Sequence, residues 1–339
     1  MRTRSLRGIF RLSVLAALVA GGLAFAQQAP DRGIVHVGGD LYRAHNNAHN
    51  TVFLVTSEGI IVSDPINRDF AEWLQRELAS MYDVPVRVVA YSHHHWDHAS
   101  GGVVFADTAE VIGHDTMPDA LALPSTDTPL SDDAAGLDAN GNGTIEESEA
   151  SGNLAGQFAL IDADGDGMLT GAEIARGPVS DVYPPSTVYS DTRTITLGGK
   201  SVELIHVAAD HSPDMTVLRF PDEDAAFFVD IISLKRLPFM DFPGLEDVDS
   251  LIETIQAVEA IDFSIGVGGH GDIGTKQDVA DHRGYIEALR DAVAAGIADG
   301  QSLEALQASI TMDEYSDWGS FNWLPNNIAG MYRMLGGAN

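Results

Sequence analysis

Residues 91–102 read YSHHHWDHASGG, which places four histidines and one aspartate within six residues of a chain that has 12 histidines in all. His93 and His95 alternate at the end of the apolar run VPVRVVAYS, which predicts a buried strand, so both imidazoles would point to the same side. Asp97 and His98 follow on the turn. Two imidazoles on one side can hold one cation, and the carboxylate and imidazole behind them can hold a second. The spacing therefore indicates metal binding.

The composition limits which metals and partners fit such a site. The chain has no cysteine, so a metal must be held by His, Asp and Glu, which suits zinc, manganese or iron rather than thiolate clusters. The formal net charge is −31, from 19 basic and 50 acidic residues. Such an acidic surface repels polyphosphate and argues against a nucleic acid as partner or substrate. We expect a small-molecule substrate, and the sequence does not indicate the oligomeric state.

Residues 1–26 are typical of a secretory signal peptide. Four arginines precede the apolar run LSVLAALVAGGLAFA, which ends in Ala24-Phe25-Ala26. The run is 15 residues long, whereas a membrane-spanning helix needs roughly 20, so cleavage is favoured over an uncleaved anchor. Removing this segment takes away four arginines and no acid, which moves the formal charge from −31 to −35. We expect a periplasmic or secreted protein that is not held at a membrane.

The elements that must position the histidines follow a repeated order. Short β-branched runs around residues 34–39, 52–57 and 59–64 predict antiparallel strands, and apolar residues at a helical period predict a helix over 68–82. A second half repeats the pattern, with strands between 192 and 232 and around 263–271, and with helices at about 247–260 and 276–296. This order predicts an α+β fold in which two mixed sheets pack face to face with helices outside.

Between the halves, residues 120–187 form a segment rich in Asp, Gly and Pro that contains an internal repeat. DANGNGTIEESE begins at Asp138 and DADGDGMLTGAE begins at Asp162, so two twelve-residue loops are offset by 24. Each has Asp or Asn at positions 1, 3 and 5, Gly at 6, an apolar residue at 8 and Glu at 12, the ligand spacing of an EF-hand calcium loop. The predicted ligands are Asp138, Asn140, Asn142, Thr144 and Glu149 in the first loop, and Asp162, Asp164, Asp166, Met168 and Glu173 in the second.

These loops predict one or two Ca²⁺ ions per chain. Ile145 and Leu169 at position 8 would pair and join the two loops. The first loop has fewer carboxylates and only a short, Gly-ended helix before it. Calcium is plentiful outside the cell, so a permanently filled structural site is favoured over a sensor.

The histidine segment resembles the signature of the metallo-β-lactamase superfamily, and four further motifs in the same order support this resemblance. ADHSPD presents His211, FFVDI presents Asp230, GVGGHGD presents His270 and IIVSDP presents Asp64, each at a strand end. The resemblance implies an αββα sandwich over residues 27–119 and 188–339, with the EF-hand pair at 120–187 as an insert that leaves near the metal face.

The resemblance also implies a ligand set. His93, His95 and His211 would bind one metal, Asp97, His98 and His270 the other, and Asp230 would bridge them, while Asp64 would support the ligands from behind. Two zinc ions are implied, with Mn²⁺ or Fe²⁺ as other choices. A water between the metals would become the hydroxide nucleophile at neutral pH, and Asp97 would orient it as the catalytic side chain.

The bridging aspartate is typical of glyoxalase II and lactonase relatives, so an exported hydrolase of an ester, thioester or lactone is the first prediction. β-Lactam hydrolysis, a mono-iron persulfide-type dioxygenase and a non-catalytic calcium-binding scaffold remain as alternatives. Lys235 and Arg236 follow Asp230 and either receive a substrate carboxylate or are ordinary surface charges. His45 and His49 either line the mouth of the site or belong to a polar loop. The aromatic segment WGSFNWLPNN near the C-terminus either packs in the core, the default, or lines the pocket.

Overall fold

The computed structural model describes residues 29–208 and 210–337, and the fold below is that of the compact unit Asp31–Asn339. The predicted signal peptide, residues 1–26, lies outside the described residues. Within the described part, no helix is both long enough and apolar enough to cross a membrane.

The first half forms a mixed seven-stranded sheet in the order β1-β2-β3-β4-β5-β6-β9. Its strands are β1 (Arg32–Gly38), β2 (Leu41–Asn46), β3 (His49–Val55), β4 (Ile60–Ser63), β5 (Val86–Ala90), β6 (Glu110–His114) and β9 (Thr187–Tyr189). The first four pair antiparallel, and β4, β5, β6 and β9 run parallel. Parallel strands end at the same edge of a sheet, so the segments that follow β4 and β5 can meet there.

The second half forms a six-stranded sheet in chain order, antiparallel except between β13 and β14. Its strands are β10 (Thr192–Leu197), β11 (Lys200–His206), β12 (Thr216–Phe220), β13 (Ala225–Phe228), β14 (Ile265–Gly268) and β15 (Ile273–Thr275).

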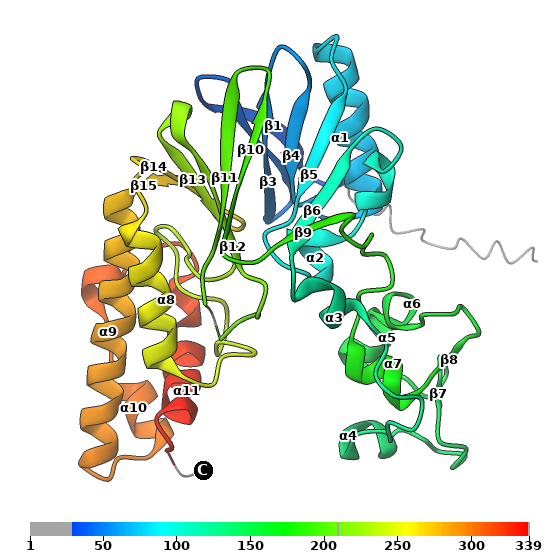
Figure 1. The fold of residues 1–339 in the computed structure, drawn as a ribbon. Coiled ribbons are helices and arrows are strands. Elements are labelled where there is room, and N and C mark those ends of the chain that lie inside the picture. Colours follow the sequence, from blue (N-terminus) through cyan, green and yellow to red (C-terminus); the bar gives the residue numbers. More distant parts are fainter. Residues whose placement is uncertain (1–28, 209, 338–339) are drawn as a thin grey trace, which may run out of the picture. The chain divides into compact units, whose positions relative to one another are not determined.

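The two sheets pack face to face, with helices on their outer faces (Figure 1). Leu54 and Ile61 of the first sheet share a buried cluster with Leu204 and Phe227 of the second. Helix α1 (Arg68–Met81) covers the first sheet, and helices α8 (Val248–Ala260), α9 (Lys276–Ala298) and α11 (Leu324–Met334) pack on the second, with α10 (Leu303–Ser309) between α9 and α11 in the chain. This arrangement confirms the predicted αββα sandwich.

Helix α1 shows how local sequence sets an outer layer. The Asn67 side chain accepts a hydrogen bond from the Phe70 amide and caps the first turn. Phe70, Leu74 and Leu78 recur at the helical period and are buried against the first sheet. The helix is therefore fixed by one cap and one apolar stripe.

The chain between β6 and β9 forms small elements with a core of their own. They are α3 (Met117–Leu121), α4 (Asp132–Ala135), β7 (Ile145–Glu146), α5 (Gly152–Gly156), α6 (Phe158–Ile161), β8 (Met168–Leu169) and α7 (Gly171–Arg176). Ile145 pairs with Leu169 between β7 and β8, as expected, and both are fully buried with Phe158 and Ile161. The chain leaves and re-enters the first sheet at neighbouring strands, which suits an insert at 120–187.

Candidate metal centre

The histidine segment follows β5 and leads into the one-turn helix α2 (Trp96–Ala99). The Ser92 amide and hydroxyl each donate to a different oxygen of buried Asp64 at 2.7 Å, and the Ser92 hydroxyl lies 3.0 Å from Nδ1 of His93. These contacts fix the His93 ring with Nε2 directed away from Asp64. Asp64 thus supports the cluster from behind, the position the resemblance implied for it.

Two groups of side chains gather at this edge of the sandwich, and within each group one possible ligand atom per residue lies within 4.8 Å of the others. The first group is His93, His95, His211 and Asp230, and the second is His49, Asp97, His98 and His270. The structure therefore brings together all seven side chains in the expected grouping and adds His49.

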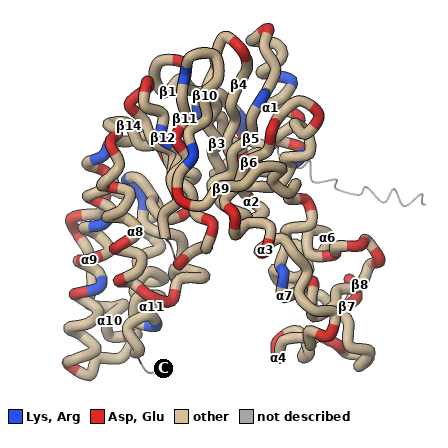
Figure 2. Tube along the Cα trace, viewed as in Figure 1, with Lys and Arg blue, Asp and Glu red and all other residues tan. Residues whose placement is uncertain are grey.

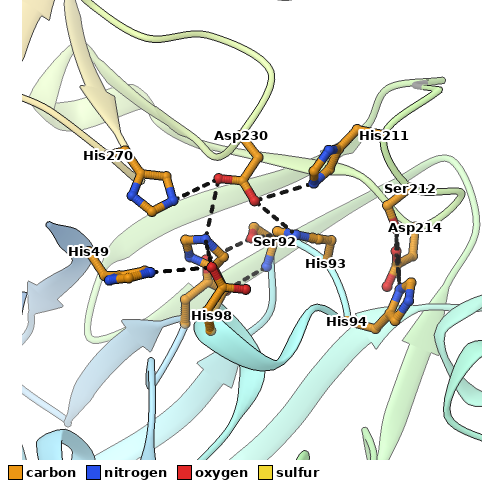
Figure 3. A network of polar contacts seen from close by, with 12 residues as sticks. His49, Ser92, His93, His94, His98, His211, Ser212, Asp214, Asp230 and His270 are labelled. Carbon is orange, nitrogen blue, oxygen red and sulfur yellow. Dashed lines mark hydrogen bonds and ion pairs between the residues drawn. The ribbon is translucent and has the colours of Figure 1, made fainter. Parts of the chain in front are cut away.

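Asp230 lies between the two groups and faces each with a different oxygen (Figure 3). Its Oδ2 is 3.3 Å from Nε2 of His93 and 3.3 Å from Nε2 of His211. Its Oδ1 is 3.3 Å from Nε2 of His98 and 3.0 Å from Nε2 of His270. A carboxylate placed in this way can bridge two cations.

The backbone and the charge of Asp230 both fit this position. Asp230 directly follows the Val229 that extends β13, and its φ of 61° is left-handed, a conformation that Asp tolerates better than most residues. Burial alone would raise the pKa of Asp230, but the charge of His98 and the close imidazoles of His211, His270 and His93 hold that pKa well below its usual value. The side chain is therefore an anion.

Several of these histidines present nitrogens that could bind a cation. Nε2 of His93, His98 and His211 is buried in each case without a hydrogen-bond partner. Burial, followed by the neighbouring rings of His93 and His211, lowers the pKa of His95 to about 2, so this ring is a neutral ligand. Unpartnered buried nitrogens, an anionic carboxylate and the absence of cysteine fit divalent zinc, manganese or iron.

His49, which the sequence placed either at the mouth of the site or in a polar loop, belongs to the second group. Its Nε2 lies 3.2 Å from Oδ2 of Asp97, and its ring packs edge-on against His270 with centroids 4.7 Å apart. The neighbouring Asn50 holds it there: the Asn50 amide donates to Gly269 O, and the side chain donates to Gly268 O and Gly271 O. The only sequence signal for His49 was its place in a His-rich hairpin.

The remaining polar residues of these segments support the groups or line a cavity beside them. His94 points away from the ligands and pairs with buried Asp214 at 2.9 Å, next to Ser212 (Figure 3). His45 and Arg236 line the cavity, whereas Lys235 pairs with Asp278 at 3.2 Å and is not among the lining residues. In WGSFNWLPNN, Trp318 packs against the core, and Trp323 lies beneath the Arg236 guanidinium.

In the second acidic loop, Asp162, Asp164 and Glu173 each place one carboxylate oxygen within 4.8 Å of the others. Gly165 and Gly167 supply the left-handed backbone of the turn, with φ of 74° and 81°. In the first loop, Asp138 accepts from the amides of Gly141 and Gly143, and Glu149 accepts from the Ala139 amide. The helices around both loops are only four to six residues long.

Comparisons with known proteins give the fold. No protein-family model matches the sequence, and no curated protein is similar to it in sequence. Among solved structures, a metallo-β-lactamase from Pontibacter korlensis is 14% identical with a TM-score of 0.52 and covers 76% of this chain and 99% of its own. A stereoselective inverting sec-alkylsulfatase from Pseudomonas sp. is 15% identical with a TM-score of 0.59 and covers 91% of this chain, which spans only 51% of the sulfatase.

The chain therefore has the metallo-β-lactamase fold and, at one edge of its sandwich, two groups of side chains that could each hold a metal ion. These observations confirm the predicted fold and show that the predicted metal ligands lie together. Metal-dependent hydrolysis, the metal and the bond that is cleaved belong to the proposal that follows.

Proposed function

We propose that the protein is a di-zinc hydrolase of an ester, thioester or lactone. The observation that supports this most is the position of Asp230, whose two oxygens face two separate ligand groups. Bound divalent cations at these groups would supply the Lewis acidity that activates a water and polarises the scissile bond. No protein nucleophile is then needed.

The chain's own residues would orient the reactants around the metals. Asp97 lies within the second ligand group, 3.2 Å from His49 and 3.6 Å from Nε2 of His98, so its carboxylate could accept a hydrogen bond from the attacking water and orient it. Ser92 and Asp64 fix His93, and Asp214 fixes His94 beside it, so the first group keeps its geometry without the substrate.

The test is a hydrolysis assay on one substrate for each bond class, namely a p-nitrophenyl ester, an acyl thioester, a γ-lactone and a chromogenic β-lactam. Wild type and His98→Ala are compared after zinc loading, with metal content measured for both. We expect turnover of the ester, thioester or lactone in the wild type and its loss in the variant. Turnover of the β-lactam alone would assign the alternative bond. No turnover of any substrate by protein with two bound metals would contradict the proposal.

Sulfate-ester hydrolysis is a second candidate. The alkylsulfatase covers more of this chain than the metallo-β-lactamase does, 91% against 76%, and has the higher TM-score. A secondary alkyl sulfate therefore belongs in the same panel. Release of sulfate that is lost in His98→Ala, with no cleavage of the acyl substrates, would favour this candidate over the first.

We propose in addition that the second acidic loop binds Ca²⁺ as a structural ion. Three of its four predicted side-chain ligands, Asp162, Asp164 and Glu173, lie close together. Glu173 is buried in the first turn of α7. The C-terminal end of this segment contacts the loop that follows His98: Val182 forms a β-bridge with Ser100, and the Gly101 amide donates to Asp181 O. A calcium ion in the second loop would stabilise the segment that makes these contacts.

A further inference from the structure

The first ligand group is assembled from two loops that belong to different sheets. His93 and His95 lie in the loop that follows β5 of the first sheet, whereas His211 lies in the loop between β11 and β12 of the second. A metal ion can be held only if the ligand atoms of both loops reach it at once, so the two loops must keep a fixed separation. Contacts that join these loops therefore act directly on this group.

One such contact is the pair of His94 and Asp214, which belong to neither ligand group. Nδ1 of His94 lies 2.9 Å from Oδ1 of Asp214, and an ionised carboxylate only accepts, so Nδ1 donates (Figure 3). The Asp214 side chain is 0% exposed, and the Ser212 hydroxyl also donates to its Oδ1. Among the described residues, Oδ2 of Asp214 has no hydrogen-bond partner. This buried carboxylate therefore depends on His94 and Ser212 for its hydrogen bonds.

The pair reaches ligands on both of its sides. Ser212, which bonds Asp214, is the chain neighbour of His211. On the other side, the His94 ring packs edge-on against the His95 ring, with centroids 4.9 Å apart. The His95 ring is otherwise in edge contact with two ligand rings, at 4.5 Å and 4.7 Å. Through His94, Asp214 of the second sheet thus supports a ligand of the first.

The loop that carries His211 is anchored on both sides of this residue. Before it, the Asp210 carboxylate accepts from two backbone amides at the start of α8, a contact within the second half. After it, Asp214 contacts the first sheet, and the Thr216 amide donates to Ser92 O at 2.8 Å. Asp214 is therefore the side-chain anchor that crosses from this loop to the loop of the other sheet.

The second ligand group has a cross-sheet contact of its own. Asn50 of β3 donates from its amide and its side chain to three carbonyl groups of residues 268–271, the turn that carries His270. In the described part of the chain, the side-chain hydrogen bonds and ring contacts of His94 and Asp214 reach the first group only. The two groups are thus joined across the sheets by separate side chains.

We propose that His94 and Asp214 are positioning residues that join the two loops of the first ligand group and set the affinity of that group, and not of the second, for its metal ion. The proposal rests on the proposed two-metal function and adds that the two affinities are controlled by separate contacts. Neither residue binds the metal or the substrate. Both act through His95 and His211.

The test measures Zn²⁺ affinity by competition with a chromogenic chelator in two backgrounds. His98→Ala leaves the first group complete and His95→Ala leaves the second complete, so each background reports on one group. In the His98→Ala background, we expect His94→Ala and Asp214→Ala each to weaken Zn²⁺ binding about tenfold to hundredfold, the range for the loss of a supporting partner. In the His95→Ala background, neither change should alter the affinity.

Asn50→Ala is the matched control, because it removes the cross-sheet contact of the other group. It should give the opposite pattern, with weaker binding in the His95→Ala background only. Combining His94→Ala with Asp214→Ala should cost no more affinity than the more affected single variant, because both changes break the same contact. His94→Asn, whose amide can still donate to Asp214, should retain more affinity than His94→Ala, a rescue that general destabilisation would not give.

The outcomes separate this proposal from the proposed function. Equal losses in the two backgrounds would mean that the pair supports the fold as a whole and would overturn the proposal. Unchanged affinities in a protein that binds two Zn²⁺ ions would overturn it and leave the hydrolase proposal intact. If wild type binds one Zn²⁺ only, the two-metal function is wrong, and a loss caused by His94→Ala in the His98→Ala background still supports the positioning role. A first group that binds no Zn²⁺ would overturn both.

Discussion

At the scale of single residues, most side chains of the candidate metal centre can be recognised from the sequence, and one cannot. The resemblance of the H-x-H-x-D-H segment and of three later strand-end motifs to the metallo-β-lactamase superfamily implied seven ligands, because these motifs are local features of the sequence. The sequence did not decide whether His49 belongs to the site. Its contact with His270 joins positions more than 200 residues apart and depends on the register of the β2–β3 hairpin. Local patterns carry no information on such a contact.

We expect His49→Ala to weaken binding of one of the two metals and to leave the other intact. The reason is that His49 belongs to the second group only, with its Nε2 3.2 Å from Asp97. By analogy with the loss of a supporting partner, the affinity should fall about tenfold to hundredfold or more. Metal content after equilibration with graded chelator concentrations measures this.

His36→Ala is the control for His49→Ala, since His36 contacts Gly39 O and the Tyr42 ring in the first hairpin and belongs to neither ligand group. If His49→Ala retains both metals as tightly as wild type, His49 is not a ligand and only orients Asp97.

At the scale of elements, the sandwich and its long helices were predictable, and several shorter elements were not. The period of apolar residues predicted α1, α8 and α9 to within a few residues of their observed ends. Strand β2 was missed because LYRAHN is short and half polar, and its alternation becomes meaningful only between β1 and β3. Strand β6 and the helices after α9 were missed because they are stabilised by packing rather than by local pattern.

Helix α9 buries a titratable group whose effect on stability can be measured. His282 is 2% exposed, and burial lowers its pKa to about 4, against about 6.5 in an unfolded chain. As the pH falls from about 6.5 to about 4, the unfolded chain takes up a proton that the folded chain does not. The free energy of unfolding should therefore decrease by up to about 3 kcal/mol in this window and remain unaffected above it.

Urea denaturation of wild type and His282→Gln between pH 8 and pH 4 measures this contribution. All other histidines titrate alike in both proteins, so the difference between the two curves isolates His282. We expect the wild type to lose stability relative to the variant below about pH 6.5. Two curves that stay parallel would mean that His282 does not stay neutral in the fold.

The two acidic loops offer a matched pair of variants. We expect Glu173→Gln to abolish most of the calcium-dependent rise in Tm and Glu149→Gln to reduce it less, because the gathered carboxylates are those of the second loop. Gln keeps the side-chain shape, and the capping of α7 by Thr170 remains possible. Thermal melts with and without Ca²⁺, together with calorimetric titration, provide the comparison. A Tm that does not respond to Ca²⁺ in wild type would contradict a structural calcium site.

At the scale of the whole molecule, the excess of acid is spread over most elements rather than gathered at the metal edge (Figure 2). Only 19 basic side chains offset 50 acidic ones. Such an excess of acid would repel polyanionic partners, which stays a prediction from the composition.

The proposed export can be checked on the full chain expressed in a bacterial host. We expect the protein to accumulate in the periplasmic fraction with Gln27 as its first residue, because the apolar run ends in an A-x-A site. Intact mass and N-terminal sequencing of the fractions decide the question. A full-length chain found in the membrane fraction would instead indicate the uncleaved anchor.

The ligands are divided between the halves of the sandwich, and this division links the metals to folding. His93 and His95 come from the first half and His211 and Asp230 from the second, while His49, Asp97 and His98 of the first half are joined by His270 of the second. Neither half alone presents a complete set. Only a chain whose two sheets are packed together would therefore present both complete ligand groups. Metal binding would stabilise this folded state by mass action. In a protein without cysteine, the cations would act as the cross-link between halves that a disulfide provides elsewhere.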